Sequence, residues 1–287
     1  MLERLGLMDT PKKIGVVADL HCGSIFGLLP PGLTTSDDRE VKPNIGQRYL
    51  WKCWEDAAEC IGKLDALVVN GDETDGRQEA QRGNELCLPM LEDQAEAAVQ
   101  CLRYLLDKTG NPKLYMTAGT EYHSQKAARE TEVVAQRLGA EQYKGLGSGR
   151  YCKEVLDLNV DGIILNFQHG IGVASGLYRA TPPDREGIWS ALAGKTGKSP
   201  KADCVVRSHA HSYVMVDHPS KSIVVTPCWQ LQTRWMRKSS AYRMLPDIGY
   251  VLITVDASKK ERGYDPCQID KKIYPLPEPN VTKLNVL

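Results

Sequence analysis

Short apolar runs alternate with stretches of helical periodicity in the first half of the chain. Apolar runs bounded by polar or glycine residues predict buried strands at Ile14–Ala18, Ala66–Asn70 and Lys113–Thr117. Apolar positions at helical spacing predict three helices: Gln47–Lys63, Gln94–Asp107 and Lys126–Leu138. Strands that alternate with helices in this way are typical of an α/β fold.

The second half of the chain is mostly strand-like. Tyr151–Leu158 and Gly162–Phe167 flank the sequence Asn159-Val160-Asp161-Gly162, and an Asp-Gly pair between two strands signals a hairpin. Four more short runs predict strands: Cys204–Arg207, Tyr213–Asp217, Ser222–Thr226 and Tyr250–Val255. We therefore expect residues 1–287 to form one domain with a layered α/β architecture.

Two segments fit neither pattern. Residues 181–201 are polar and rich in Pro, Gly and Lys around a short helical piece, which predicts a surface insertion rather than a domain boundary. The tail from about Lys259 contains several prolines, and we expect it to wrap the surface as extended chain.

Composition excludes several classes of protein. The formal net charge is zero, so no global charge attracts nucleic acid or a membrane surface. The nine cysteines are odd in number and dispersed, without a Cys-x-x-Cys motif, which disfavours a disulfide framework or a thiolate zinc site. No run approaches the roughly 20 apolar residues of a membrane span, and Met1–Lys13 lacks the apolar core of a signal peptide. We expect a cytoplasmic protein without a membrane partner.

The candidate chemistry follows the predicted strands. In open α/β sheets the carboxyl ends of the strands form the ligand crevice, and five of the six histidines lie at such ends. The strand ends read as follows: Asp19-Leu20-His21, Gly71-Asp72-Glu73-Thr74-Asp75-Gly76, Gly119-Thr120-Glu121-Tyr122-His123, Gln168-His169-Gly170 and Ser208-His209-Ala210-His211.

Each motif alone has an ordinary explanation as turn residues or a surface histidine pair. Their shared placement favours a binuclear metal site instead, because carboxylates and imidazoles suit Mn²⁺, Fe, Zn²⁺ or Ni²⁺. One carboxylate would bridge two ions roughly 3.5–4 Å apart, and a bridging hydroxide would attack a phosphate ester. The ions would also neutralise charge on the phosphoryl transition state.

This order of motifs, over roughly residues 14–230, resembles the calcineurin-like metallophosphoesterase family. The resemblance implies a four-layer α/β/β/α sandwich, with two facing mixed β-sheets flanked by helices and the metals at one sheet edge. It also implies a metal-dependent phosphoric ester hydrolase that uses two divalent ions, with Mn²⁺ ahead of Fe, Zn²⁺ or Ni²⁺. Hydrolysis would proceed by direct attack of the metal-bridging hydroxide, without a phosphoenzyme.

The resemblance also assigns the ligands. Asp72 would bridge the two ions and so take part in catalysis, while Asp75 would orient its neighbours by hydrogen bonds rather than bind metal. The remaining ligands are Asp19, His21 and His211 for the first metal, and His169 and His209 for the second.

The third motif departs from the family pattern of Gly-Asn-His followed by Asp or Glu. Read without a gap, Thr120 replaces the Asn and Glu121 replaces the His. We hypothesise instead that Glu121 supplies an oxygen to the second metal and that His123 reaches the leaving group, because a carboxylate is a better hard-metal ligand than a hydroxyl. The alternative is that Glu121 only caps the following helix. Ser208, where the family usually has Gly, affects loop geometry.

The substrate signals are local. The Gly-Thr-Glu-x-His variant resembles a subset encoded by bacteriophages, which hints at nucleotides or nucleic acid. Arg179 can clamp a phosphate or lie as a solvated surface residue. Arg234–Lys238, with Tyr242 and Arg243, can follow a nucleic-acid backbone, although we expect the commoner outcome, a solvated face with buried aromatics.

These signals favour a phosphodiesterase that acts on a nucleotide or nucleic acid. A phosphomonoesterase, including a protein phosphatase, is the first alternative. A non-catalytic metal-binding scaffold is the second, and a nucleic-acid-binding protein with an incidental metal site is the third. Every proposed ligand position outside the third motif is filled, which favours turnover over a degenerate site.

Overall fold

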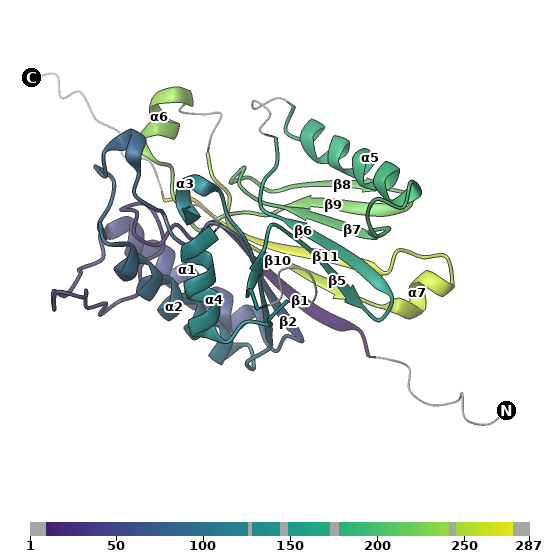
Figure 1. Ribbon diagram of the computed structural model, residues 1–287, viewed down its shortest axis with the longest axis horizontal. Coiled ribbons are helices and arrows are strands. Elements are labelled where there is room, and N and C mark those ends of the chain that lie inside the picture. The colour runs from purple at the N-terminus through teal and green to yellow at the C-terminus, as the bar shows by residue number, and fades with distance from the viewer. Residues whose placement is uncertain (1–9, 126–127, 144–148, 173–177, 241–244, 278–287) are drawn as a thin grey trace, which may run out of the picture.

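Two β-sheets with helices on their outer faces make up the computed structural model, which describes residues 10–125, 128–143, 149–172, 178–240 and 245–277 (Figure 1). The strands are β1 (Lys12–Val17), β2 (Ala66–Asn70), β3 (Lys113–Thr117), β4 (Cys152–Lys153), β5 (Val155–Val160), β6 (Ile163–Gln168), β7 (Cys204–Arg207), β8 (Val214–His218), β9 (Lys221–Val225), β10 (Ile248–Val255) and β11 (Cys267–Tyr274). The helices are α1 (Ile45–Ile61), the 3-10 helix η1 (Glu79–Gln81), α2 (Leu91–Lys108), α3 (Glu121–Ser124), α4 (Arg129–Leu138), α5 (Thr181–Lys195), α6 (Arg234–Ser240) and α7 (Ala257–Glu261). Within the described residues, no helix combines the length and apolar character needed to cross a membrane.

Both sheets are mixed. The first has the order β11-β10-β1-β2-β3-β4, in which β1 to β4 run parallel and the pairs β1–β10 and β10–β11 are antiparallel. The second has the order β5-β6-β7-β9-β8, in which β6, β7 and β9 run parallel and the outer strands are antiparallel. The parallel strands of each sheet therefore direct their carboxyl ends to one edge, where the sequence predicts the chemistry.

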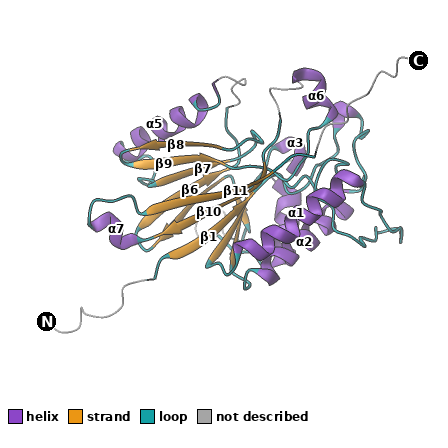
Figure 2. Cartoon of the chain, turned by 180° about the vertical axis from the view of Figure 1, so that it is seen from behind, coloured by secondary structure: helices purple, strands orange, loops and turns teal. Residues whose placement is uncertain are grey.

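Three apolar cores hold four layers together. Val16, Val68, Phe167 and Val206 belong to the core formed by residues of both sheets. A larger core lies between the first sheet and the helices α1, α2 and α4, and a smaller one lies on the other face of the second sheet, which α5 contacts (Figure 2). The architecture is α/β/β/α, which confirms the fold class predicted from the sequence.

The hydrophobic runs locate the central strands well. The strands β2, β3 and β7 have the predicted bounds. The hairpin signal between β5 and β6 is also confirmed, because Val160 pairs with Ile163 around a two-residue loop. Asp161 and Gly162 in that loop have φ values of 51° and 86°, as a type I′ turn requires.

The stretch 181–201, expected to be a surface insertion, contributes α5, the fourth layer. The buried face of α5 is built from small or cyclic residues, so its sequence lacks the large apolar stripe that signals a packed helix. A Cβ at Gly187 would lie 2.7 Å from Cδ1 of Ile223, so glycine permits the close approach of helix and sheet. The large apolar side chains of α5 are exposed instead: Ile188, Trp189 and Leu192.

The sequence predicts extended surface chain for the C-terminal segment; within its described residues, Cys267–Tyr274 is extended but belongs to the first sheet as β11. β11 pairs with β10 over its whole length, from Ile248 opposite Tyr274 to Val255 opposite Cys267. Its burial alternates weakly because it is an edge strand, which explains why no strand signal stood out in the sequence.

Trp54 provides a test of the helix-to-sheet core. The indole is fully buried, meets Trp229 edge-on with ring centroids 4.6 Å apart, and donates from Nε1 to Cys101 O at 3.0 Å. We expect Trp54→Ala to lower the free energy of unfolding by about 3–5 kcal/mol, measured by urea denaturation. Trp189→Ala, at a side chain that is 63% exposed, should change it by less than about 0.5 kcal/mol. Equal effects of the two substitutions would contradict this packing.

Candidate metal centre

A buried polar network joins the two sheets at the edge where the predicted ligands lie. Nδ2 of Asn70, the last residue of β2, donates to Ser208 Oγ at 2.7 Å and to Gln168 O at 3.1 Å. Thr117 Oγ1 donates to Asn70 Oδ1 at 2.8 Å, and Ser208 Oγ lies 2.8 Å from Thr226 Oγ1. These residues end or follow β2, β3, β6, β7 and β9. The network therefore fixes the ends of strands from both sheets relative to one another.

Asp19, His21 and His211 form the first group of candidate ligands. Each offers an atom within 4.8 Å of the other two, and all three side chains are buried. Asp19 Oδ1 lies 3.2 Å from His211 Nε2 and 3.8 Å from His21 Nε2, and the two Nε2 atoms are 3.2 Å apart. Residues nearly 200 positions apart in sequence thus direct an oxygen and two nitrogens at one point.

Asp72, His169 and His209 form the second group, and their ligand atoms again lie within 4.8 Å of one another. His169 Nε2 lies 2.9 Å from Asp72 Oδ2 and 3.8 Å from Asp19 Oδ1, so it lies between carboxylates of both groups. His169 Nδ1 donates to the Asn70 carbonyl at 2.7 Å, so Nε2 is the nitrogen that carries the lone pair when the ring is neutral. The two groups are therefore adjacent and share the space between Asp19 and Asp72.

The backbone at these positions is strained. Left-handed φ values are unusual for residues other than glycine and cost about 1–3 kcal/mol each. Five of the twelve non-glycine residues with positive φ in the described ranges are candidate ligands: Asp19 (55°), His21 (47°), Asp72 (52°), His209 (67°) and His211 (54°). Such a concentration of strain is typical of a functional site rather than of ordinary turns.

Gly119 allows the third motif to approach Asp72. A Cβ at Gly119 would lie 2.1 Å from Asp72 Oδ1, so no other residue fits without movement. The next residue, Thr120, donates its backbone N–H to Asp72 Oδ1 at 2.7 Å, and its Oγ1 lies 3.2 Å from each Asp72 oxygen. The close approach orients the Asp72 carboxylate.

Asp75 lies behind His21. Its Oδ1 accepts from His21 Nδ1 at 2.9 Å, which fixes the ring and leaves Nε2 facing Asp19 and His211. Gln230 Nε2 donates to the same oxygen at 3.3 Å, and Gln94 Oε1 accepts from Asp75 N at 3.1 Å. A carboxylate that holds a ligand histidine in this way raises its basicity and sets its orientation.

The electrostatics indicate a concentration of negative charge. Burial disfavours the charged form of His21, but the carboxylates of Asp19 and Asp75 outweigh it and raise the pKa of His21 to about 10. For His169, burial is likewise outweighed by Asp72 and Asp19, which raise its pKa to about 9. Despite burial, neighbouring histidines hold the pKa of Asp19 and of Asp72 well below the usual range for a carboxyl group. The buried carboxylates therefore attract a cation, whether a proton on histidine or a metal ion.

The donor set fits divalent metal ions. Asp19 Oδ1 is buried and has no hydrogen-bond partner among the described residues, which is costly unless a cation binds it. The surrounding donors are carboxylate oxygens and imidazole nitrogens, which suit Mn²⁺, Fe, Zn²⁺ or Ni²⁺. Asp19, His21 and His211 would hold one ion and Asp72, His169 and His209 a second.

The geometry does not bring Glu121 into either group. Glu121 is the exposed first residue of α3, where its charge complements the helix N-terminus. Thr120, not Glu121, lies against Asp72, so the ligand role hypothesised for Glu121 has no support in this arrangement. The sequence could not decide this point, because the direction of each side chain depends on where the short helix begins.

His123 lies beside candidate ligands of both groups. It shares a group with His21 and Asp72, and its ring meets His21 edge-on with centroids 4.5 Å apart. Its Nδ1 donates to Asp75 O at 2.7 Å, and its side chain is 18% exposed. Burial lowers the pKa of His123, while Asp72 opposes this shift. Nδ1 is thus engaged with the Asp75 carbonyl, which leaves Nε2 as the ring nitrogen that can meet a further partner.

The other predicted substrate residues lie outside the ligand groups. Arg179 is half-buried just before α5. Tyr242 and Arg243 fall outside the described residues. The aromatic residue of α6 is not buried as expected, because Trp235 is 55% exposed. Sequence reasoning also missed Asn70 and Gln94, whose only signals are a polar end to an apolar strand and a polar residue early in a helix.

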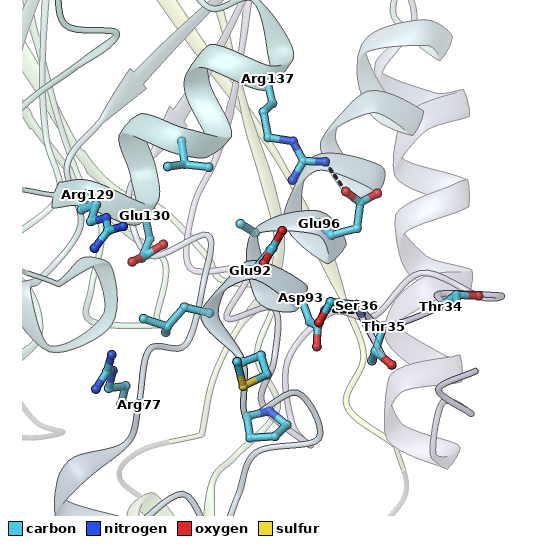
Figure 3. Close-up of a pocket in the computed structure, with 15 residues that line it drawn as sticks. Thr34, Thr35, Ser36, Arg77, Glu92, Asp93, Glu96, Arg129, Glu130 and Arg137 are labelled. Atoms are coloured by element: carbon cyan, nitrogen blue, oxygen red, sulfur yellow. Dashed lines mark hydrogen bonds and ion pairs between the residues drawn. The ribbon is translucent and has the colours of Figure 1, made fainter. Parts of the chain in front are cut away.

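A cavity of about 1000 Å³ lies beside the first turns of α2 and α4 (Figure 3). Arg77, two residues after Asp75, lines it, but none of the candidate ligands does. Arg137 is paired with Glu96 there. The charged lining comprises four acidic and three basic residues: Glu92, Asp93, Glu96, Glu130, Arg77, Arg129 and Arg137. This excess of carboxylates does not favour a polyanion.

No protein-family model and no curated protein sequence matches the chain. Similar solved structures include vacuolar protein sorting 29 from Cryptosporidium parvum, at 11% identity and a TM-score of 0.41, over 93% of this chain and 99% of that one. A predicted phosphoesterase from Streptococcus pneumoniae TIGR4 has 13% identity and a TM-score of 0.40, over 93% and 94%. A novel archaeal phosphodiesterase has 10% identity and a TM-score of 0.44, over 91% and 99%.

Metal content distinguishes the roles of Asp72 and Glu121, the two carboxylates considered as metal ligands. We expect Asp72→Asn to weaken Mn²⁺ binding at least about tenfold, because it removes a charge from the buried donor set. Glu121→Ala should bind as much Mn²⁺ as the unaltered protein, because Glu121 lies outside the groups. Inductively coupled plasma mass spectrometry after Mn²⁺ loading and desalting measures the Mn²⁺ content of both variants. Loss of one ion per chain in Glu121→Ala would restore the ligand role hypothesised from the sequence.

Proposed function

We propose that this protein is a phosphoesterase that depends on two divalent metal ions. The observation that carries the proposal is the pair of adjacent ligand groups, which are connected through Asp19 and Asp72 and buried at the carboxyl edge of both sheets. Bound there, divalent ions lower the pKa of water and neutralise charge on a phosphoryl group. The order of the motifs, which resembles the calcineurin-like metallophosphoesterases, supports the same class of reaction.

The chain's own residues have separate roles in this proposal. Asp72 holds the two groups together, and Thr120 donates to it and fixes its rotamer. Asp75 orients His21 through Nδ1, and the Asn70 carbonyl orients His169 in the same way. His123 supplies a proton from Nε2 to the leaving oxygen.

We favour phosphodiesters of nucleotides or nucleic acid over monoesters. The support is local: α6 carries an exposed tryptophan and basic side chains, without an acidic residue in its own sequence. An extended substrate gains from such contacts beyond the reacting phosphate, whereas a small monoester does not.

Hydrolysis of bis-p-nitrophenyl phosphate by metal-stripped protein resupplied with Mn²⁺ tests the proposal. We expect activity that requires metal and that falls at least about 100-fold in Asp72→Asn, since the substitution removes the carboxylate charge of the second group. Hydrolysis of p-nitrophenyl phosphate, measured in parallel, should be slower. Faster hydrolysis of the monoester would favour a phosphomonoesterase. Two tightly bound ions without hydrolysis of either ester would favour a non-catalytic scaffold.

His123→Ala provides a second test, through the leaving group. The leaving group of a dinucleotide is a nucleoside alkoxide, which needs a proton. The leaving group of bis-p-nitrophenyl phosphate is p-nitrophenolate, which leaves readily without one. We expect kcat to fall by about 10²–10⁴ for the dinucleotide and by much less for bis-p-nitrophenyl phosphate. His218→Ala is the matched control, because His218 lies on β8 and pairs with Asp184 instead. Equal losses with both substrates would assign His123 a binding or structural role.

A further inference from the structure

The helix α6 presents an aromatic and basic surface. Trp235 is 55% exposed, and Arg234, Arg237 and Lys238 flank it in the same helix. Arg234 is paired with Glu85 at 3.8 Å, whereas Arg237 and Lys238 are exposed and have no ion pair within the described ranges. An exposed indole between cationic side chains is the chemistry that stacks a base and contacts phosphates.

Contacts connect α6 to the metal centre. Arg234 pairs with Glu85, whose backbone N–H donates to Gln78 Oε1 at 3.1 Å, and Gln78 in turn donates to Asp75 Oδ2. Gln230, four residues before α6, donates directly to Asp75 Oδ1. Four residues of extended chain span at most about 14 Å, so α6 begins within that distance of Gln230, which contacts the carboxylate that orients His21.

The helix that carries His123 reaches the same segment, because Tyr122 donates its hydroxyl to Gln81 Oε1 in η1. Figures 1 and 2 show α6 and α3 at the same end of the molecule, away from α7. The aromatic and basic surface of α6 therefore lies at the same end of the molecule as the helix that carries His123.

Charge distinguishes this surface from the neighbouring cavity. The cavity of Figure 3 carries more carboxylates than guanidinium groups, which disfavours a chain of phosphates. Among the residues that the structure describes, Arg234 is the one base of α6 with an ion pair, and its partner Glu85 is buried. A polyanion that leaves the metal centre would thus be drawn along α6 rather than into the cavity.

We propose that α6 binds a single strand of nucleic acid next to the scissile phosphate, with a base stacked on Trp235 and phosphates against Arg237 and Lys238. This inference rests on the proposed function, since it names the substrate of the same site. A duplex offers no free base face to a single exposed indole, so a single strand is the form that fits.

Binding in the absence of turnover tests the inference. The probe is a fluorescein-labelled single-stranded thymidine oligonucleotide, and the measurement is fluorescence anisotropy of the full chain in EDTA at low salt. We expect Trp235→Ala to weaken binding about 5- to 150-fold, the range found for loss of one stacked base. Arg237→Ala should weaken binding. It should also reduce the slope of log Kd against log salt by about the amount that one phosphate contact contributes.

Trp189→Ala is the matched control. Trp189 is 63% exposed on α5 and has the exposed bases Arg185 and Lys195 on the same helix, but α5 packs on the second sheet. We expect this variant to bind the oligonucleotide like the unaltered chain. Equal weakening by both tryptophan substitutions, or no binding by the unaltered chain, would overturn the inference.

Activity on bis-p-nitrophenyl phosphate separates this inference from the proposed function. Trp235→Ala should retain that activity, because the small diester does not extend to α6. Retained activity together with unchanged oligonucleotide binding in Trp235→Ala would overturn the role of α6 alone. Absence of hydrolysis by the unaltered chain would overturn the proposed function, while the binding result would still decide whether α6 holds a single strand.

Discussion

The side chain of Asn70 is the constraint on which the rest of the site depends. Candidate ligands that follow β1 and β2 of the first sheet must meet ligands that follow β6 and β7 of the second, and facing sheets can slide relative to one another. Asn70 donates to Ser208 and Gln168 of the second sheet while it accepts from Thr117 of its own. A buried amide is costly unless every partner is present, so this network favours a single alignment of the sheets.

The site concentrates features that a folded chain otherwise avoids. Buried carboxylates lie close together, five ligands have left-handed backbone, and Asp19 Oδ1 has no hydrogen-bond partner among the described residues. Each costs free energy, and the close-packed layers around the site offset that cost. Gln94 and Gln230 hold the loop after β2 through buried hydrogen bonds to Asp75 and Gly76. A bound cation relieves the charge, which links metal binding to the stability of this edge.

The outer surfaces have different characters for physical reasons. The helix α5 completes the four layers with a glycine- and proline-rich face, and it can lie close to the second sheet because Gly187 has no side chain. Its large apolar residues therefore face outward. The helix α6 instead follows the loop from which Gln230 donates to Asp75, and it exposes a tryptophan and basic residues. An exposed tryptophan with basic neighbours thus has different expected roles on the two helices.

The sequence by itself determined the layered α/β class, the bounds of β2, β3 and β7, and the positions after strands that carry Asp and His. These follow from local rules, because a strand buried on both faces is a short apolar run and parallel strands end at one edge. Only the tertiary structure decided that Thr120 rather than Glu121 faces Asp72, that 181–201 forms a layer, that β11 joins the sheet and that Trp235 is exposed. Each of these depends on contacts between residues distant in sequence, which neither periodicity nor motif spacing records.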